Sequence, residues 1–254
     1  MKTLLVLVFG GVLTLCVSAQ TLFFAGDSTL DDHKRKVTAM PHRSWGTELE
    51  KSMKVGCKVD NRAQSGRSTK TFVNEGHWKR LVESLQPGDF VGMAFGHNDM
   101  KCSGKYAEKV YAAADGDYSA YLRQFVRETR AKGATPFIMS PIRRGSFGKD
   151  GKLTEWTTER GESLTTYANA ARRVAQEMQV EFVDMHELTR QLMEKVGKAE
   201  SDKFFVISTG WRRAQDGEPV KDVTHPVQAG AEAFSKLFLD DVRARKLSVA
   251  TLFN

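Results

Sequence analysis

Short apolar segments alternate with longer amphipathic segments along most of the chain. Turn-forming residues bound five of the short segments, which predicts β-strands at residues 22–25, 57–59, 90–95, 136–139 and 182–183. Helices are predicted between and after them, around residues 45–53, 69–85, 118–132, 163–179, 186–196 and 227–243. In the third of these helices Tyr118, Leu122, Phe125 and Val126 fall at three- and four-residue spacing, so one helix face is expected to be buried.

This order of elements predicts the fold class. Strands that alternate with helices of this length indicate a parallel sheet with helices packed on both faces. We therefore expect an α/β protein, a three-layer α/β/α sandwich around five strands. Because no Pro- or Gly-rich linker interrupts the pattern, residues 20–254 are predicted to form a single domain. In such a sheet ligands bind beyond the carboxyl ends of the strands, so a site is expected in the segments that follow them.

The first 19 residues have the pattern of a secretory signal peptide. Lys2 supplies a positive charge, residues 4–17 are almost wholly apolar, and Val17-Ser18-Ala19 places small residues at the cleavage spacing. The apolar run is shorter than the roughly 20 residues that span a bilayer, so no stable membrane anchor is expected. We expect an exported protein that begins near Gln20. Whether export ends in a periplasm or outside the cell is left open.

Composition and charge narrow the class of partner. The chain has 254 residues, 41% of them apolar, and three cysteines, which excludes a disulfide miniprotein, a collagen-like rod and a disordered chain. Its formal net charge is +7, or +6 once Lys2 is removed with the leader. A basic exported protein can bind nucleic acid, an anionic membrane surface or an acidic polymer, or its charge can serve solubility alone.

Four polar segments lie where a parallel sheet would place a site. Gly26-Asp27-Ser28-Thr29 follows the first predicted strand, and residues 61–68 follow the second. Gly96-His97-Asn98-Asp99 follows the third strand, and Asp222-Val223-Thr224-His225 precedes the last helix. Their order along the chain predicts that all four meet at one edge of the sheet.

The residue types in these segments suit nucleophilic acyl transfer. Ser28 lies on a tight turn opened by Gly26, and the N-terminus of a following helix is expected behind it. A serine hydroxyl needs a base to take its proton, and His225 is the candidate. Asp222, three residues earlier, can bind the other imidazole nitrogen and fix the tautomer. The alternative for Ser28 is a helix cap without catalytic function.

Acyl transfer also needs donors for the oxyanion of the tetrahedral intermediate. The backbone N–H of Gly66 can approach that oxygen because glycine has no side chain in the way. The amide of Asn98 adds a side-chain donor, and the backbone N–H of Ser28 is the third. The sequence thus predicts an oxyanion hole formed by Ser28, Gly66 and Asn98.

Because these four polar segments occur in this order, the chain resembles the SGNH (GDSL-like) serine esterases. The segments Gly66-Arg67-Ser68-Thr69-Lys70-Thr71-Phe72, Pro87-Gly88-Asp89 and Pro141-Ile142-Arg143-Arg144 make it similar to the rhamnogalacturonan acetylesterase branch. The resemblance implies a flavodoxin-like fold with five parallel strands in order 2-1-3-4-5. It also implies catalytic Ser28, Asp222 and His225, and removal of acetyl groups from a pectin backbone without metal or organic cofactor. The disulfides of the fungal members have no equivalent pair here.

Basic residues near the predicted site suggest how such a substrate would be bound. Arg67, Lys101, Arg143 and Arg144 each come after a strand's carboxyl end. We expect a basic rim that binds the galacturonate carboxylates beside the acetyl ester, and ordinary surface charge is the alternative. The expected partner is therefore an acetylated acidic polysaccharide and not nucleic acid. The oligomeric state is left open.

Three other side chains have two interpretations each. His97 either orients the Asn98 loop as a hydrogen-bonded spacer or contacts the substrate. Trp156 and Tyr167 either stack on a sugar ring or pack between a loop and a helix.

The cysteines and the remaining histidines indicate neither a disulfide nor a metal site. Cys57 opens the second strand and Cys102 follows the third, so they lie at opposite ends of a parallel sheet. A five-residue strand spans roughly 16 Å, whereas a disulfide needs Cα atoms within about 7 Å. We expect two free, mostly buried thiols. His186 precedes Glu187 but lacks the second histidine of a zinc helix, so no metal is expected.

Two alternative functions are kept. An SGNH lipase or thioesterase acting on other acyl esters would share the catalytic residues, although no long apolar lid segment is present. A non-catalytic carbohydrate-binding protein would share the fold, but it would have no need to retain the five groups that the chemistry requires.

Overall fold

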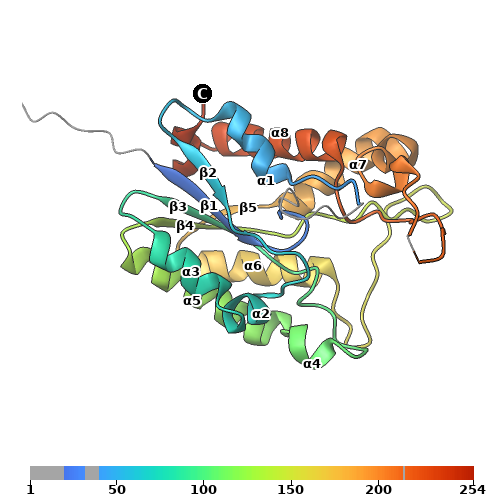
Figure 1. Cartoon of the computed structure of the whole chain (residues 1–254), viewed down its shortest axis with the longest axis horizontal. Helices are drawn as coiled ribbons and strands as arrows, with labels where there is room; N and C mark the ends of the chain where they lie inside the picture. The colour runs from blue at the N-terminus through green and yellow to red at the C-terminus, as the bar shows by residue number, and fades with distance from the viewer. Residues whose placement is uncertain (1–19, 32–39, 214) are drawn as a thin grey trace, which may run out of the picture.

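The computed structural model describes residues 20–31, 40–213 and 215–254 (Figure 1). The predicted signal peptide, residues 1–19, lies outside the described residues. Within the described ranges, no helix is both long and apolar enough to cross a membrane.

A five-stranded parallel sheet forms the centre of the protein. Its spatial order is β2-β1-β3-β4-β5, and every neighbouring pair is parallel. The predicted fold class and strand order are therefore confirmed. The strands are β1 (Thr21–Gly26), β2 (Lys58–Asn61), β3 (Phe90–Ala94), β4 (Thr135–Met139) and β5 (Glu181–Val183).

After the threonines that open β1 and β4, the central strands β1, β3 and β4 are apolar and buried, because helices cover both faces of the sheet. Gly92 in β3 has no side chain among larger apolar residues, and the close packing around it explains why. A Cβ at this position would lie 2.5 Å from Cζ of Phe137 and 2.9 Å from Cε1 of Phe24. Glycine therefore leaves room for two aromatic rings that meet over the middle of the sheet.

Helices form the two outer layers (Figure 1). On one face lie α2 (Thr69–Asn74), α3 (His77–Ser84), α5 (Ser119–Ala131) and α6 (Leu164–Met178). On the other face lie α1 (Trp45–Glu48), α7 (Met185–Asp202) and α8 (Gln228–Ala244). The remaining short helices are η2 (Leu49–Ser52), α4 (Ala107–Val110), η3 (Ala114–Tyr118), η4 (Val206–Thr209) and η5 (Ser248–Leu252).

Some predicted helix boundaries are wrong. The helix expected at residues 69–85 is two helices, α2 and α3, because the chain turns at Gly76, whose φ is +74°. The helix expected at 45–53 continues from α1 into the 3₁₀ turn η2. The short elements α4 and η3 were not predicted, since the segment that contains them has no clear helical period.

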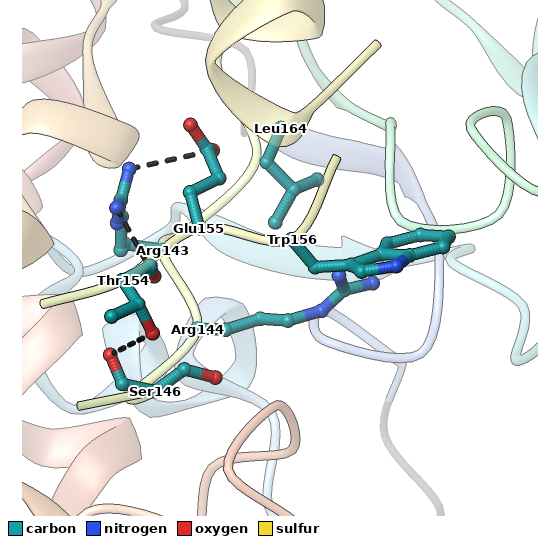
Figure 2. A pocket seen from close by; sticks show the side chains of 7 residues that line it. All are labelled: Arg143, Arg144, Ser146, Thr154, Glu155, Trp156 and Leu164. Carbon is teal, nitrogen blue, oxygen red and sulfur yellow. Dashed lines mark hydrogen bonds and ion pairs between the residues drawn. The ribbon is translucent and has the colours of Figure 1, made fainter. Parts of the chain in front are cut away.

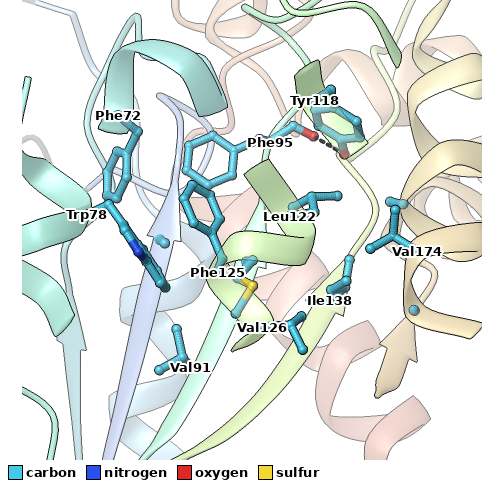
Figure 3. Packing of buried hydrophobic residues seen from close by; sticks show 14 of the residues in the cluster. Phe72, Trp78, Val91, Phe95, Tyr118, Leu122, Phe125, Val126, Ile138 and Val174 are labelled. Atoms are coloured by element: carbon cyan, nitrogen blue, oxygen red, sulfur yellow. Dashed lines mark hydrogen bonds between the residues drawn. The ribbon is translucent and has the colours of Figure 1, made fainter. Parts of the chain in front are cut away.

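The core on the α5 face anchors the loop that follows β3 (Figure 3). Phe125 of α5 stacks on Trp78 with ring centroids 4.1 Å apart and lies 5.9 Å from the ring of Phe95. The Tyr118 hydroxyl donates to the backbone oxygen of Phe95 at 3.2 Å. Tyr118, Leu122, Phe125 and Val126 are all buried, so the predicted inner face of α5 is confirmed. The segment that begins with Gly96 therefore starts from a rigid point.

Cys57 and Cys102 are free thiols. Cys57 directly precedes β2 and Cys102 follows β3, as expected from the strand order. Both residues are partly buried, which agrees with the prediction of two free, mostly buried thiols.

Candidate active site

Ser28 lies on a turn at the carboxyl end of β1. The backbone oxygen of Asp27 accepts from the N–H groups of Leu30 and Asp31 at 3.2 and 3.0 Å, which closes the turn. Gly26 is required before it, because a Cβ there would lie 2.8 Å from the backbone oxygen of Ala94. The described residues after Ser28, up to Asp31, form no helix. The prediction of a helix dipole directly behind Ser28 is therefore wrong for this part of the chain.

Ser28, His225 and Asp222 form a continuous line of hydrogen bonds. Nε2 of His225 lies 2.8 Å from Oγ of Ser28, and Nδ1 lies 2.6 Å from Oδ2 of Asp222. The serine and the histidine are 197 residues apart in the sequence, so the fold brings them together. Each ring nitrogen of His225 therefore has one hydrogen-bond partner, a hydroxyl on Nε2 and a carboxylate on Nδ1.

Asp222 also accepts hydrogen bonds from its own turn. Its Oδ1 binds the backbone N–H groups of Thr224 at 2.7 Å and His225 at 3.0 Å. Burial alone would raise the pKa of Asp222, but the hydrogen bonds and charge of His225, together with these N–H groups, hold it below its ordinary value. An ionised carboxylate only accepts, so the proton of a neutral His225 lies on Nδ1 and leaves Nε2 free to accept from Ser28.

Backbone hydrogen bonds hold the segment that carries His225. Its backbone oxygen accepts from Val206 N at 3.1 Å, and the oxygen of Asp222 accepts from Ile207 N at 2.9 Å. On the opposite side, Arg43 N donates to the oxygen of Pro226 at 2.7 Å. The ring of His42 packs against the ring of His225 with centroids 5.4 Å apart. The imidazole is therefore positioned before any substrate binds.

Gly66 and Asn98 line one pocket, of about 310 Å³, at the same edge of the sheet. The register pairs Gly26 with Ala94, so Ser28 and Asn98 follow neighbouring strands. Gly66 has a φ of +77° and open space where a side chain would be. Among the described residues, the backbone N–H groups of Ser28 and Gly66 donate to no protein acceptor. These N–H groups are available as oxyanion donors.

The Asn98 amide is buried and held at both ends. Its Nδ2 donates to the backbone oxygen of Arg67 at 3.1 Å, and its Oδ1 accepts from Nζ of Lys101 at 2.6 Å. An amide nitrogen has two hydrogens, so one remains for a further acceptor.

Two buried carboxyl groups support the loops of the site. Oδ1 of Asp27 accepts from the N–H and hydroxyl of Thr29 at 3.0 and 2.9 Å, and Oδ1 of Asp99 accepts from those of Thr69 at 2.8 and 2.6 Å. Burial raises the pKa of Asp27, and it raises that of Asp99 to about 7. The pair Thr69–Asp99 joins the loop after β2 to the loop after β3, a link that the sequence did not reveal.

A family model described as "GDSL-like Lipase/Acylhydrolase" matches residues 22–238. The chain belongs to this family. The prediction that the chain is a carboxylic ester hydrolase of this family is thus confirmed.

Two relatives carry the name that the sequence blocks suggested. The rhamnogalacturonan acetylesterase RhgT of Bacillus subtilis is 29% identical over 225 residues, which cover 87% of this chain and 88% of the relative. The rhamnogalacturonan acetylesterase of Emericella nidulans is 27% identical over 225 residues, which cover 80% and 82%. The predicted resemblance to this branch of the family is confirmed.

Solved structures show the same fold. The chain matches protein YxiM of Bacillus subtilis with a TM-score of 0.70 and 20% identity over 91% of its own length, and it spans 58% of that chain. It matches Axe2, an acetylxylan esterase from Geobacillus stearothermophilus, with a TM-score of 0.61 and 19% identity, covering 89% of this chain and 94% of that one.

Arg143 does not lie on the predicted basic rim of this GDSL-like acylhydrolase, and His97 is buried as well. Arg143 is only 8% exposed, and its guanidinium lies 3.2 Å from Nε2 of His186 and 3.4 Å from Glu155. His97 is only 4% exposed, and burial, together with the charge of Arg144, holds its pKa well below the ordinary value. Arg143 thus holds a loop in place. The burial of His97 argues against a contact with a polysaccharide, and neither of its ring nitrogens has a hydrogen-bond partner among the described residues, so the hydrogen-bonded spacer interpretation is not confirmed either.

Arg144, the next residue in the chain, lies beneath an exposed indole (Figure 2). Its Cζ is 5.9 Å from the ring centroid of Trp156, which is 55% exposed. Burial lowers the pKa of Arg144, and the charges of Asp27 and Asp222 oppose that shift. Tyr167, in contrast, is buried and donates to the backbone oxygen of Ala112 at 2.9 Å, so it packs inside the protein.

The pocket beside Gly66 and Asn98 is cationic. Three basic side chains, from Arg67, Lys101 and Lys109, line it together with one acid, Glu75. Lys109 and Arg67 each bind Glu75 at 2.8 Å and lower its pKa to about 2, against the effect of burial. The exposed ring of Tyr106 forms part of the wall. Lys109 and Tyr106 were not predicted, because they lie in the segment without clear periodicity.

Within the described residues, no group of three or more His, Cys, Asp or Glu side chains is placed to hold a metal ion.

Proposed function

We propose that this protein is a serine acetylesterase that removes acetyl groups from an acidic polysaccharide of the pectin type. The observation that carries the proposal is the hydrogen-bonded line from Ser28 through His225 to Asp222, with contacts of 2.8 and 2.6 Å. This line lies at the carboxyl edge of the sheet, where Gly66 and Asn98 supply donors.

The first half of the reaction transfers the acetyl group to the enzyme. Oγ of Ser28 attacks the ester carbonyl carbon while Nε2 of His225 takes the hydroxyl proton. The carbonyl oxygen becomes an oxyanion that accepts from Ser28 N–H, Gly66 N–H and the Asn98 amide, each worth about 3 kcal/mol. The bond to the sugar oxygen then breaks, and that oxygen takes the proton from His225.

The second half restores the enzyme. Water gives a proton to His225 and its oxygen adds to the acetyl carbon on Ser28. The second tetrahedral intermediate expels Oγ of Ser28, which recovers its proton from His225, and acetic acid leaves and ionises to acetate. Asp222 stabilises the imidazolium in both halves. Nucleophile, base and donors are all protein groups, so the proposed reaction needs no metal or organic cofactor.

The charge near the site supports an acidic substrate. The pocket beside Asn98 carries three cations against one carboxylate, and Arg144 adds a guanidinium below the exposed Trp156. A uronate sugar next to the acetylated residue would bring a carboxylate to these groups. The names of the relatives from Bacillus subtilis and Emericella nidulans support the same class of substrate. Export through the predicted leader, residues 1–19, would bring the enzyme to such a polymer.

Acetate release from acetylated rhamnogalacturonan, acetylated homogalacturonan and acetylated xylan, measured in parallel, tests the proposal. Ser28→Ala serves as the blank. The proposal predicts Ser28-dependent release from the pectic substrates well above that from xylan. Equal release from xylan would keep the esterase and reject the acidic substrate. Release only from longer-chain acyl esters would favour a lipase or thioesterase, and no Ser28-dependent release from any ester would favour a non-catalytic carbohydrate-binding protein.

A further inference from the structure

The Asn98 amide has a partner on each side, and the two partners fix which way it faces. Its nitrogen is bound by the backbone oxygen of Arg67 at 3.1 Å, and its oxygen by the Lys101 ammonium at 2.6 Å. A flipped amide would direct its nitrogen at an ammonium and its oxygen at a carbonyl, and both contacts would be repulsive. The observed orientation leaves the second N–H of Asn98 free.

We propose that Lys101 is a positioning residue of the oxyanion hole, acting on the ester oxygen only through the side chain of Asn98. The inference rests on the proposed function, in which Asn98 is an oxyanion donor. The ammonium withdraws electron density from the amide through Oδ1, which makes the remaining N–H a stronger donor. It also prevents the amide from rotating when negative charge develops nearby.

The backbone keeps Lys101 next to Asn98. Lys101 N donates to the oxygen of Asn98 at 3.1 Å, and Met100 N donates to the oxygen of Gly96 at 3.2 Å. The side chain of Met100 is fully buried and anchors the turn in the core. Lys101 is an exposed residue overall, but desolvation lowers the pKa of its ammonium against the opposing charge of Asp27. The lysine is therefore part of the same rigid turn as the amide that it holds.

Lys101 also lines the cationic pocket, so direct binding of a substrate carboxylate is the competing role. A neutral aryl acetate separates the two roles, because it has no carboxylate to bind. If Lys101 only binds substrate, its removal raises KM for the acidic polymer and leaves the aryl acetate unaffected.

A double-mutant cycle on an aryl acetate tests the proposal, with Lys101→Met, Asn98→Ala and both together. We expect Lys101→Met to lower kcat at least about tenfold with little change in KM, compared with the roughly 100- to 1000-fold loss for a missing oxyanion donor. In the Asn98→Ala background the same change should cost less than about twofold. An equal loss in both backgrounds would overturn the proposal.

Lys101→Arg provides a second readout that does not depend on the folding of Lys101→Met. Arginine keeps its charge at high pH, whereas lysine loses it. We expect Lys101→Arg to retain part of the activity and to shift the alkaline fall in kcat to higher pH. An unchanged alkaline limb would contradict the proposal. If the wild-type protein shows no Ser28-dependent hydrolysis at all, the proposed function itself fails. If hydrolysis is present but Lys101→Met costs the same with and without Asn98, only the role proposed for Lys101 fails.

Discussion

In the proposed reaction the hydroxyl of Ser28 must lose its proton, and the imidazole of His225 can take it only when Nε2 faces Oγ. The sequence predicted Ser28, Asp222 and His225 because each lies in a short motif next to a strand or helix end. It misplaced Arg143 and left open whether His97 contacts the substrate, because the burial of both residues depends on packing between loops that are distant in the sequence. A residue's chemistry is local, whereas its exposure is decided by the whole fold.

Asp222→Asn tests the residue that fixes the tautomer. An asparagine amide can present N–H to Nδ1, which favours the proton on Nε2, and Nε2 then cannot accept from Ser28. We expect kcat on an aryl acetate to fall by about 10²–10⁴-fold while the melting temperature stays close to that of the wild type. Activity within tenfold of the wild type would show that the Asp222–His225 contact is not needed.

Asp99→Asn tests a buried carboxyl through the pH dependence of stability. The pKa of Asp99 is raised to about 7 in the folded state, against about 3.9 in an unfolded chain. Between these values the folded state binds the extra proton, so this contribution to stability is full below pH 4 and is lost as the pH rises to about 7. The contribution of Asp99 to the free energy of unfolding is on the order of 4 kcal/mol at most.

Denaturant titrations of both proteins at several pH values measure this effect. The free energy of unfolding of Asp99→Asn, relative to the wild type, should increase from pH 4 to 7 and be constant above. A difference that does not vary with pH would mean that Asp99 ionises normally.

At the scale of elements, the order of parallel strands decides where the catalytic groups meet. The alternation of strands and helices predicted the sheet, and with it the shared edge after β1, β2 and β3. The break between α2 and α3 at Gly76 was missed, because a single glycine inside a helical segment does not by itself show that the chain turns there. The link from Thr69 to Asp99 was also missed, since side-chain hydrogen bonds between loops leave no periodic signal.

Gly26→Ala tests the close packing where β1 meets the Ser28 turn. The new Cβ would lie 2.7 Å from Cδ1 of Leu30 and 2.8 Å from the oxygen of Ala94, and the second contact is with backbone that cannot easily move. We expect a loss of about 1–3 kcal/mol in unfolding free energy, together with reduced kcat. Ser28→Ala is the control, since it should remove activity without lowering stability. A Gly26→Ala protein with unchanged stability and kcat would refute this account.

At the scale of the whole molecule, charge is distributed so that cations gather beside the site. The net charge of +7 suggested an acidic partner without showing where it binds. The structure brings Arg67 after β2 and Lys109 of α4 into one pocket, and no local pattern predicts that meeting. The composition thus predicted that the protein is basic, and only the fold shows where the basic side chains gather.

Lys109→Glu tests this pocket, with Lys79→Glu as the matched control. Both lysines are exposed, at 64% and 80% of the side chain, but Lys79 lies on α3 and does not line the pocket. We expect Lys109→Glu to lower kcat/KM for the acidic polysaccharide about three- to tenfold at low salt, and to leave an aryl acetate unaffected. Equal effects of the two variants would attribute the loss to net charge and not to the pocket.

Labelling with a fluorophosphonate shows whether Ser28 is the nucleophile. This reagent forms a phosphorus–oxygen bond with an activated serine and releases fluoride. We expect a single label on the peptide that contains Ser28, inactivation in proportion to labelling, and loss of labelling in His225→Ala. A label on another residue, or acetate release that persists in Ser28→Ala, would contradict this role of Ser28.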